Sequence, residues 1–412
     1  MLEIPARIEP CLFESDVPAV LADLAVDIQG EAATLGGMVD QSSLSELADL
    51  VRMMNCYYSN LIEGHNTKPV EIEKALAGAT IEIERRPLAL EAKAHVEVQR
   101  GIDIAYLEGK LPSPTSQKFI LATHRIFYEE MPEEFRKTVA EEEGGRTVDI
   151  VPGKFRNTPQ EDISVGRHVP PSSEVVQNFM DYFEKRFSAA EGKGSGRIIA
   201  IATAHHRFNF IHPFVDGNGR VSRLMSHAMG LRAGIGGAGL WSISRGLARG
   251  LAGKGEYKLF MDSADSQRRG DRDGRGNLSE AALAEFSEWF LSVMLDQIRF
   301  SKAIFRLDRI QERYKDLLID RKFDAKSIDL VASVFKFGAL ERGDVPQAMR
   351  VPDRTARFAV KKLTEEGFLK SDTPRGPLRI AFPLSFRERL FPNLFADEAI
   401  VTPEPPTLRL GR

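Results

Sequence analysis

One short segment of the sequence gathers several residue types that phosphate chemistry requires. Residues 212–223 read H-P-F-V-D-G-N-G-R-V-S-R. The segment offers an imidazole that could act as a base, His212, and a carboxylate that could bind Mg²⁺, Asp216. Together with the glycines and arginines that follow, these are the parts needed to hold a nucleoside triphosphate and to attack one of its phosphorus atoms.

The glycine-rich centre of this segment is suited to binding an anion. A helix is expected to begin near Gly217, and the first N–H groups of a helix lack partners within it and attract anions. Gly217 and Gly219 allow the backbone to approach a phosphate closely because they have no Cβ, and Asn218 adds a polar side chain. Arg220 and Arg223 lie three residues apart, so both lie on one side of the helix and could reach the outer phosphates.

Two helices are expected to position this segment. Residues 196–211 are predicted to be helical, and this helix should end at His212 because Pro213 disfavours helical geometry there. The next helix should run from about Gly217 to about residue 233. A D-G-N-G turn alone, or a histidine before a proline alone, is more often structural than catalytic. The order of the histidine and the D-G-N-G turn between two predicted helices favours a functional site.

The segment resembles the signature of Fic-domain proteins, H-x-F-x-D/E-G-N-G-R-x-x-R, at every defined position, and the flanking residues 115–300 are similar too. The resemblance implies a mainly α Fic fold and transfer of AMP from ATP to a protein hydroxyl, with pyrophosphate leaving. It implies that His212 is the general base and that Asp216 is the Mg²⁺ ligand. It also implies an anion hole and two arginines for the β- and γ-phosphates: Gly217, Asn218, Gly219, Arg220 and Arg223.

A second motif lies in the N-terminal region. Apolar residues three and four positions apart predict a helix over 43–62, and Gly64 follows it directly. Ser59 and Glu63 lie four residues apart near its end and project the same way. For such a pair alone, a solvated helix end is the better interpretation.

In a Fic protein the same pair has another meaning, because it resembles the inhibitory motif S/T-x-x-x-E-G/N of the family's second class. The resemblance implies that Glu63 pairs with Arg223. An arginine neutralised in this way cannot bind the γ-phosphate, and the carboxylate would repel it. Some relatives with this glutamate also remove AMP from their targets, which the sequence leaves open here.

Residues 144–172 contain many glycines and prolines, which break any helix. The β-prone stretches 148–151 and 163–165 predict loops with a small hairpin. Residues 153–171 resemble the flap that precedes the family signature, and an open hairpin edge can take a target segment as an added strand. Ile163 and Val165 would be flap residues near the site, and His168 is interpreted as a solvated loop histidine.

The C-terminal part has a different pattern. Residues 325–392 are predicted to form a short helix, a helix, a turn, a third helix and a hairpin, which is the order of an α+β winged helix-turn-helix domain. Residues 324–390 contain 13 Lys and Arg against 9 Asp and Glu. This excess suits DNA phosphates, with Arg354 and Arg357 as the first groove contacts, but a winged helix used for protein contact is about equally expected.

Length and composition limit the number of domains and the class of protein. A chain of 412 residues predicts two or three domains. We expect an N-terminal helical region over 1–112 with the inhibitory helix at 43–64, a catalytic core over 113–318, the winged helix over 325–392 and a tail over 393–412. A net charge of −3 argues against a polycation, and two cysteines outside any C-x-x-C argue against zinc. Without a long apolar run or a signal peptide, a cytoplasmic protein is expected.

Three functional hypotheses follow from the sequence. The first is an autoinhibited protein AMP-transferase that uses ATP and Mg²⁺ and modifies a Ser, Thr or Tyr hydroxyl of a target, including a second copy of itself in a homodimer. The second is a DNA-binding regulator whose Fic core senses nucleotides. The third is a Fic transferase with another donor, such as UTP or CDP-choline.

Overall fold

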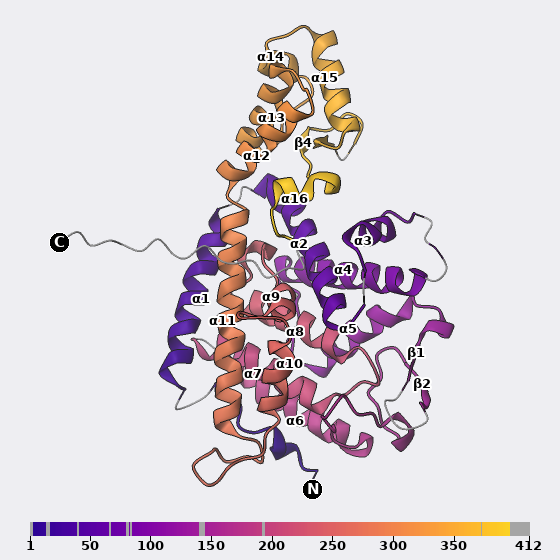
Figure 1. Ribbon diagram of the computed structural model, residues 1–412, viewed down its shortest axis with the longest axis vertical. Helices are drawn as coiled ribbons and strands as arrows, with labels where there is room; N and C mark the ends of the chain where they lie inside the picture. Colours follow the sequence, from indigo (N-terminus) through magenta and orange to yellow (C-terminus); the bar gives the residue numbers. More distant parts are fainter. Residues whose placement is uncertain are drawn as a thin grey trace, which may run out of the picture.

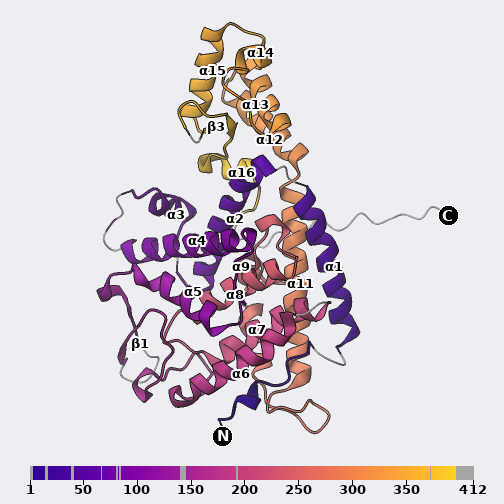
Figure 2. The ribbon, with the colours of Figure 1, turned by 180° about the vertical axis from the view of Figure 1, so that it is seen from behind.

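Helices make up most of the protein in this computed structural model, which describes residues 3–395 except 14–16, 39–40, 66, 80–81, 83–84, 140–144, 192–193 and 372. The predicted class, mainly α with a small β-hairpin, is confirmed. Figures 1 and 2 show a helical core with a smaller group of helices extending from one end. None of the helices in the described part of the chain is long and apolar enough to cross a bilayer.

The centre of the core is the helix pair that flanks the 212–223 segment. Helix α7 (Gly196–Ile211) packs against α8 (Asn218–Arg232), with α6 (Val176–Ser188) and α11 (Glu280–Ile304) on its other sides. Almost every residue of α7 is buried, including the polar residues Thr203, His205, His206 and Arg207, so this helix runs through the centre of the core. Both helices agree with their predicted bounds to within one residue.

The N-terminal helices surround this pair. Helix α1 (Ala19–Gly37) lies along α11, and α2 (Gln41–Ile62) packs between α4 (Arg86–Leu107) and α9 (Ile243–Arg249) (Figure 1). The helix predicted over 43–62 is therefore confirmed as α2. The remaining core helices are α3 (Pro69–Leu76), α5 (Gln117–Glu129) and α10 (Glu256–Ala264).

The hairpin lies partly outside the stretch in which it was predicted. Strand β1 (Lys137–Val139) pairs antiparallel with β2 (Thr147–Asp149), so the predicted strand at 148–151 is real but its partner precedes residue 144. The predicted strand at 163–165 is wrong: only an isolated bridge joins Val165 to His168. Prolines on both sides, at 159 and 170–171, lack the N–H groups that a longer ladder would need.

Short 3₁₀ turns connect many of these elements. They are η1 (Pro5–Ile8), η3 (Glu133–Phe135), η4 (Pro159–Glu161), η5 (Ser173–Val175), η6 (Ala189–Glu191), η7 (Gly237–Gly239) and η8 (Leu384–Phe386).

The C-terminal group begins earlier than the sequence suggested. The sequence over residues 279–317 predicts helix throughout, which is wrong, because the chain leaves helical geometry at Phe305 and Arg306, between α11 and α12 (Leu307–Asp320). Helix α12 then packs against α13 (Ala325–Phe337) and α16 (Arg387–Leu390).

The elements after α13 follow the predicted order. They are α14 (Val345–Met349), α15 (Asp353–Glu365), β3 (Leu369–Lys370) and β4 (Arg379–Ile380), with a bridge between Leu340 and Leu378. This order agrees with a winged helix, whose identity and bounds stay predictions.

The C-terminal group contacts the core at the predicted inhibitory helix. Lys370 forms an ion pair with Glu46 of α2, and the Phe395 ring packs on Tyr57 of α2 with 5.8 Å between ring centroids. Residues 393–395, expected to begin a tail, thus lie against the core, with Phe395 buried. The rest of the predicted tail lies outside the described residues.

Candidate functional site

The 212–223 segment makes a sharp connection between α7 and α8. Helix α7 ends at His212, which has φ 50° and ψ 60°, so this residue is left-handed rather than extended as a following proline usually requires. Gly217, the residue before α8, has φ 85°. A Cβ on Gly217 would also lie 3.0 Å from the Tyr128 ring, so both backbone conformation and space require glycine here.

Two side chains hold this connection in shape. The Asn218 amide accepts a hydrogen bond from the Phe214 N–H (2.9 Å) and donates one to the Phe214 carbonyl (2.8 Å). The His124 ring stacks on the Phe214 ring at 3.8 Å, and its Nε2 lies 3.2 Å from the Asp216 carbonyl oxygen. The Asn218 side chain is thus engaged within the loop, and what it offers an anion is its backbone N–H at the start of α8.

His212 has the protonation state that a base requires. Its imidazole is partly buried, and burial together with the positive charges of His168 and Arg156 lowers the pKa of His212 to about 3. The ring hydrogen-bonds to the backbone of Asn209. Arg156 fixes the backbone below it by donating from Nε to the His212 carbonyl (2.7 Å) and from Nη2 to the Ile211 carbonyl (3.1 Å). The neutral imidazole therefore keeps one nitrogen free of a proton near neutral pH.

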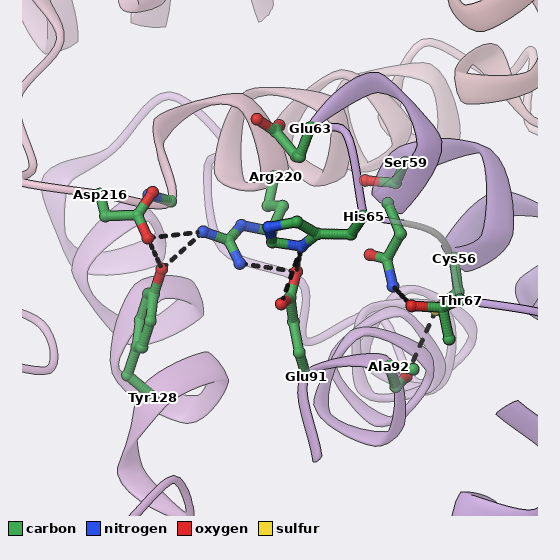
Figure 3. A network of polar contacts seen from close by, with 12 residues as sticks. Cys56, Ser59, Glu63, His65, Thr67, Glu91, Ala92, Tyr128, Asp216 and Arg220 are labelled. Carbon is green, nitrogen blue, oxygen red and sulfur yellow. Dashed lines mark hydrogen bonds and ion pairs between the residues drawn. The ribbon is translucent and has the colours of Figure 1, made fainter. Parts of the chain in front are cut away.

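Asp216, whose side chain is 40% exposed, and the buried Arg220 belong to one polar cluster (Figure 3). The Asp216 carboxylate accepts hydrogen bonds from the Gly217 N–H (2.6 Å), Tyr128 OH (3.0 Å) and Arg220 Nη2 (3.0 Å). Burial raises the pKa of Asp216, but Arg220 and these donors outweigh burial and the pKa is lowered, so the carboxylate stays ionised. On its other side, the Arg220 guanidinium lies 2.7 Å from a carboxylate oxygen of Glu91 on α4.

Arg223 lies one turn further along α8 and is 1% exposed. Its Nη2 lies 2.5 Å from Glu63 Oε1, and its Nε donates to Ser59 Oγ (2.9 Å). A Cβ built on Gly219 would collide with the same oxygen of Glu63. The Glu63 carboxylate therefore lies directly over the start of α8, where the sequence predicts that an anion binds.

The predicted flap residues take a looser position. Ile163 lies half-buried in a loop, and Val165 is 44% exposed beside its bridge to His168. The interpretation of His168 as a solvated histidine is wrong. Its Nδ1 lies 2.8 Å from Asp265 Oδ2 and its Nε2 lies 2.9 Å from the Phe210 carbonyl oxygen, so its ring ties the flap to α7 and to the residue after α10.

Several residues of the site could not be found from the sequence. Three residues contact the motif although they lie between 56 and 129 positions away from their partners in the sequence: Glu91, Tyr128 and Arg156. Glu91 and Tyr128 lie in stretches with no motif of their own, and Arg156 lies in the flap-like segment 153–171, where nothing local distinguishes it from the other charged residues.

Comparisons with known proteins agree with this geometry. The model of the Fic/DOC family matches residues 114–229, the part of the chain that contains α5 to α8 and the complete motif. The chain contains a Fic domain. A curated "Protein adenylyltransferase Fic" from Nematostella vectensis is 29% identical over 181 residues, or 43% of this chain and 37% of the relative. One of the same description from Drosophila grimshawi is 37% identical over 90 residues, or 22% of this chain and 18% of the relative.

These matches cover well under half of the length of the curated relatives, whereas solved structures extend the likeness to most of the chain. A Fic family protein from Desulfovibrio desulfuricans aligns with a TM-score of 0.53 at 16% identity and covers 89% of this chain and 98% of its own. A Fic-domain signaling protein from Bacteroides thetaiotaomicron aligns with a TM-score of 0.50 at 18% identity and covers 68% of this chain and 96% of its own. At these identities the likeness shows the Fic fold alone.

Proposed function

We propose that this Fic-domain chain is an autoinhibited protein adenylyltransferase, which moves AMP from ATP to a hydroxyl side chain of a target protein and releases pyrophosphate. The observation that carries the proposal is the arrangement at the start of α8, where a left-handed glycine, an ionised carboxylate and two arginines adjoin a neutral imidazole. The curated adenylyltransferases with the same domain support the choice of reaction.

The start of α8 would bind the phosphates. The unpaired N–H groups of its first turn and the positive end of the helix favour an anion there. Arg220 and Arg223 would add charge-assisted hydrogen bonds to the outer phosphates, once Arg223 is released from Glu63.

Asp216 fits a magnesium ion that is shared with the nucleotide. Its carboxylate is ionised, and Mg²⁺ prefers hard oxygen ligands. The described residues contain no group of three or more His, Cys, Asp and Glu side chains that could hold a metal. A single carboxylate plus phosphate oxygens is the arrangement that Mg²⁺ adopts at nucleotide sites. The ion would neutralise phosphate charge as pyrophosphate leaves.

His212 would remove the proton from the target hydroxyl as its oxygen attacks the α-phosphorus. A pKa of about 3 keeps the ring unprotonated before ATP binds, although a base is more effective when its pKa is closer to neutrality. The negative charge of the bound phosphates would raise the pKa of His212 toward that range. The target segment would dock beside the predicted flap residue Val165, which is 44% exposed.

Glu63 would inhibit this reaction by occupying Arg223. With Arg223 neutralised, the triphosphate would lose its γ-phosphate contact and its α-phosphorus would turn away from in-line attack. A misplacement of about 1 Å can lower a rate by about a hundredfold. The same carboxylate could hold a water for the reverse process, removal of AMP from a target.

Incubation with α-labelled ATP and Mg²⁺ tests the proposal. Label is expected on the Glu63→Gly protein itself, at a higher level than on the wild type. No label is expected on His212→Ala or on the variant that combines Glu63→Gly with His212→Ala. Labelling by α-labelled UTP in place of ATP would favour another donor. Absence of protein labelling by any nucleotide, with folded Glu63→Gly, would contradict the transferase.

The surface of α15 supports a second candidate function, a DNA-binding regulator with the Fic core as its nucleotide sensor. Arg354, Arg357 and Lys361 are exposed on this helix, and Phe358 between them is 71% exposed. Cations on an exposed helix suit DNA phosphates. A gel shift on the promoter of its own gene that weakens with salt and with Arg354→Ala would support this function. Equal mobility of the DNA with and without the protein would contradict this second function.

A further inference from the structure

The chain that follows Glu63 makes a second contact with the site. His65, two residues later, places its Nδ1 3.1 Å from Oε2 of Glu91 on α4. The turn that carries it is internally fixed, because the His65 N–H donates to the Asn60 carbonyl (2.9 Å) and the Asn60 amide donates to Thr67 Oγ1 (3.2 Å). The His65 ring is therefore not a loose side chain at a helix end.

Glu91 connects this turn to Arg220. Its side chain is 6% exposed, and its Oε1 lies 2.7 Å from Arg220 Nη1 and 3.2 Å from His65 Nδ1. Burial raises the pKa of Glu91, but the charges of Arg220 and His65 outweigh burial and the pKa is lowered. Figure 3 shows Glu91 below Arg220 with the His65 ring beside it. A buried charge needs partners, so Glu91 holds both Arg220 and His65 in place.

The orientation of Arg220 is determined by this arrangement. Its Nη1 meets Glu91, and its Nη2 donates to Tyr128 OH (2.7 Å) and to Asp216 (3.0 Å). Partners on both terminal nitrogens fix the plane of the guanidinium. Asp216 and Tyr128 hold only one side of it, so Glu91 is needed to hold the other.

We propose that His65 and Glu91 are positioning residues through which the inhibitory segment is attached to the site at a second point. Residues 59–65 hold Arg223 directly through Glu63 and hold Arg220 through His65 and Glu91. When the segment withdraws, His65 leaves with it, whereas Glu91 remains on α4 and keeps Arg220 aimed at the phosphates. This inference rests on the proposed function in one respect, that Arg220 and Arg223 bind phosphates.

His65 is tested by variants that separate its hydrogen bond from its bulk. His65→Ala is expected to raise the rate of hydrogen exchange of the backbone amides in 59–67. It is also expected to raise auto-labelling about three- to tenfold, which corresponds to the loss of one hydrogen bond. His65→Asn keeps an N–H donor on Cγ, where Nδ1 lies in histidine, and its labelling is expected to stay within about twofold of the wild type because a hydrogen bond to Glu91 is retained. Since His65 lies at the surface, its variants should fold.

Glu91 is tested by calorimetric titration of ATP and Mg²⁺ in a His212→Ala background, where no turnover occurs. Glu91→Gln is expected to weaken binding about tenfold or more, as loss of a charge-assisted hydrogen bond does. Glu97→Gln is the matched control, since Glu97 lies on the same helix and, among the residues that the structure describes, forms an ion pair only with Lys93, at 3.7 Å. Circular dichroism checks that both variants are folded.

The two sets of results separate this inference from the proposed function. Unchanged exchange in His65→Ala, or equal ATP affinity of Glu91→Gln and Glu97→Gln, would overturn the second attachment. Increased exchange in His65→Ala with no labelling by any variant would keep the attachment and refute the transferase.

Discussion

Replacing Glu63 by glycine would remove the contact that, in the proposed mechanism, closes the phosphate site. The lost interaction is a charge-assisted hydrogen bond of 2.5 Å to Arg223, which is buried, whereas the Glu63 side chain is 31% exposed. Such bonds contribute about 1.5–3 kcal/mol, and partial exposure favours the lower end of that range. A change of about 1.5–2 kcal/mol alters an equilibrium about 10- to 30-fold. If activity follows the population of the open site, Glu63→Gly should raise auto-labelling by that factor.

The initial rate of label transfer from α-labelled ATP measures this effect, with Mg²⁺ in excess and with thermal unfolding as the check on folding. Glu63→Gln should lie between the wild type and glycine, because its amide can still hydrogen-bond Arg223 but cannot neutralise it. Equal rates for folded Glu63→Gly and the wild type would refute the reasoning, even if both are active.

Three further predictions follow from the same contacts. Ser59→Ala removes the hydrogen bond to Arg223 Nε and should raise labelling about three- to tenfold, less than Glu63→Gly does; an effect as large as that of glycine would contradict the ranking. Asp216→Asn should lower labelling about a hundredfold or more and weaken its dependence on Mg²⁺, since a metal ion contributes several kcal/mol of charge stabilisation; retained activity in EDTA would exclude this role. The protein should lose stability in mild acid, because burial lowers the pKa of four histidines to about 3 or 4: His95, His124, His205 and His212. Below pH 6.5 these histidines are protonated in the unfolded chain but stay neutral in the native state. Each histidine can therefore lower the free energy of unfolding by up to about 2 kcal/mol at pH 5. Equal urea midpoints at pH 7 and pH 5 would contradict this.

Local signals were enough to predict the helices around the site and the residues between them. The pattern over 196–211, the proline after His212 and the glycine at 217 set two helix ends, and each depends only on neighbours in the chain. The pairing of Glu63 with Arg223 was also predicted, but through the resemblance of two motifs and not from helix geometry.

The sequence could not indicate contacts in which neither partner stands out. Glu91 is one of many charged residues on α4, and only the packing of α4 against α8 brings it to Arg220. His168 was misread because Asp265, its partner, lies 97 residues later in a highly charged stretch. The break between α11 and α12 was missed because residues 305–306 include neither glycine nor proline.

The two arginines of the motif are restrained in different ways, and this difference bears on what inhibition can do. Glu91 holds Arg220 from α4, which belongs to the packed core, whereas Glu63 holds Arg223 from the end of α2 and a turn. Withdrawal of one segment would therefore free Arg223 and leave Arg220 oriented. A nucleotide that needs only the inner phosphate contacts would tolerate the inhibited site, while a triphosphate in reactive alignment would not. In the proposed mechanism, inhibition would act on the position of the outer phosphate more than on nucleotide occupancy, because the carboxylate of Glu63 would compete with that phosphate for one guanidinium.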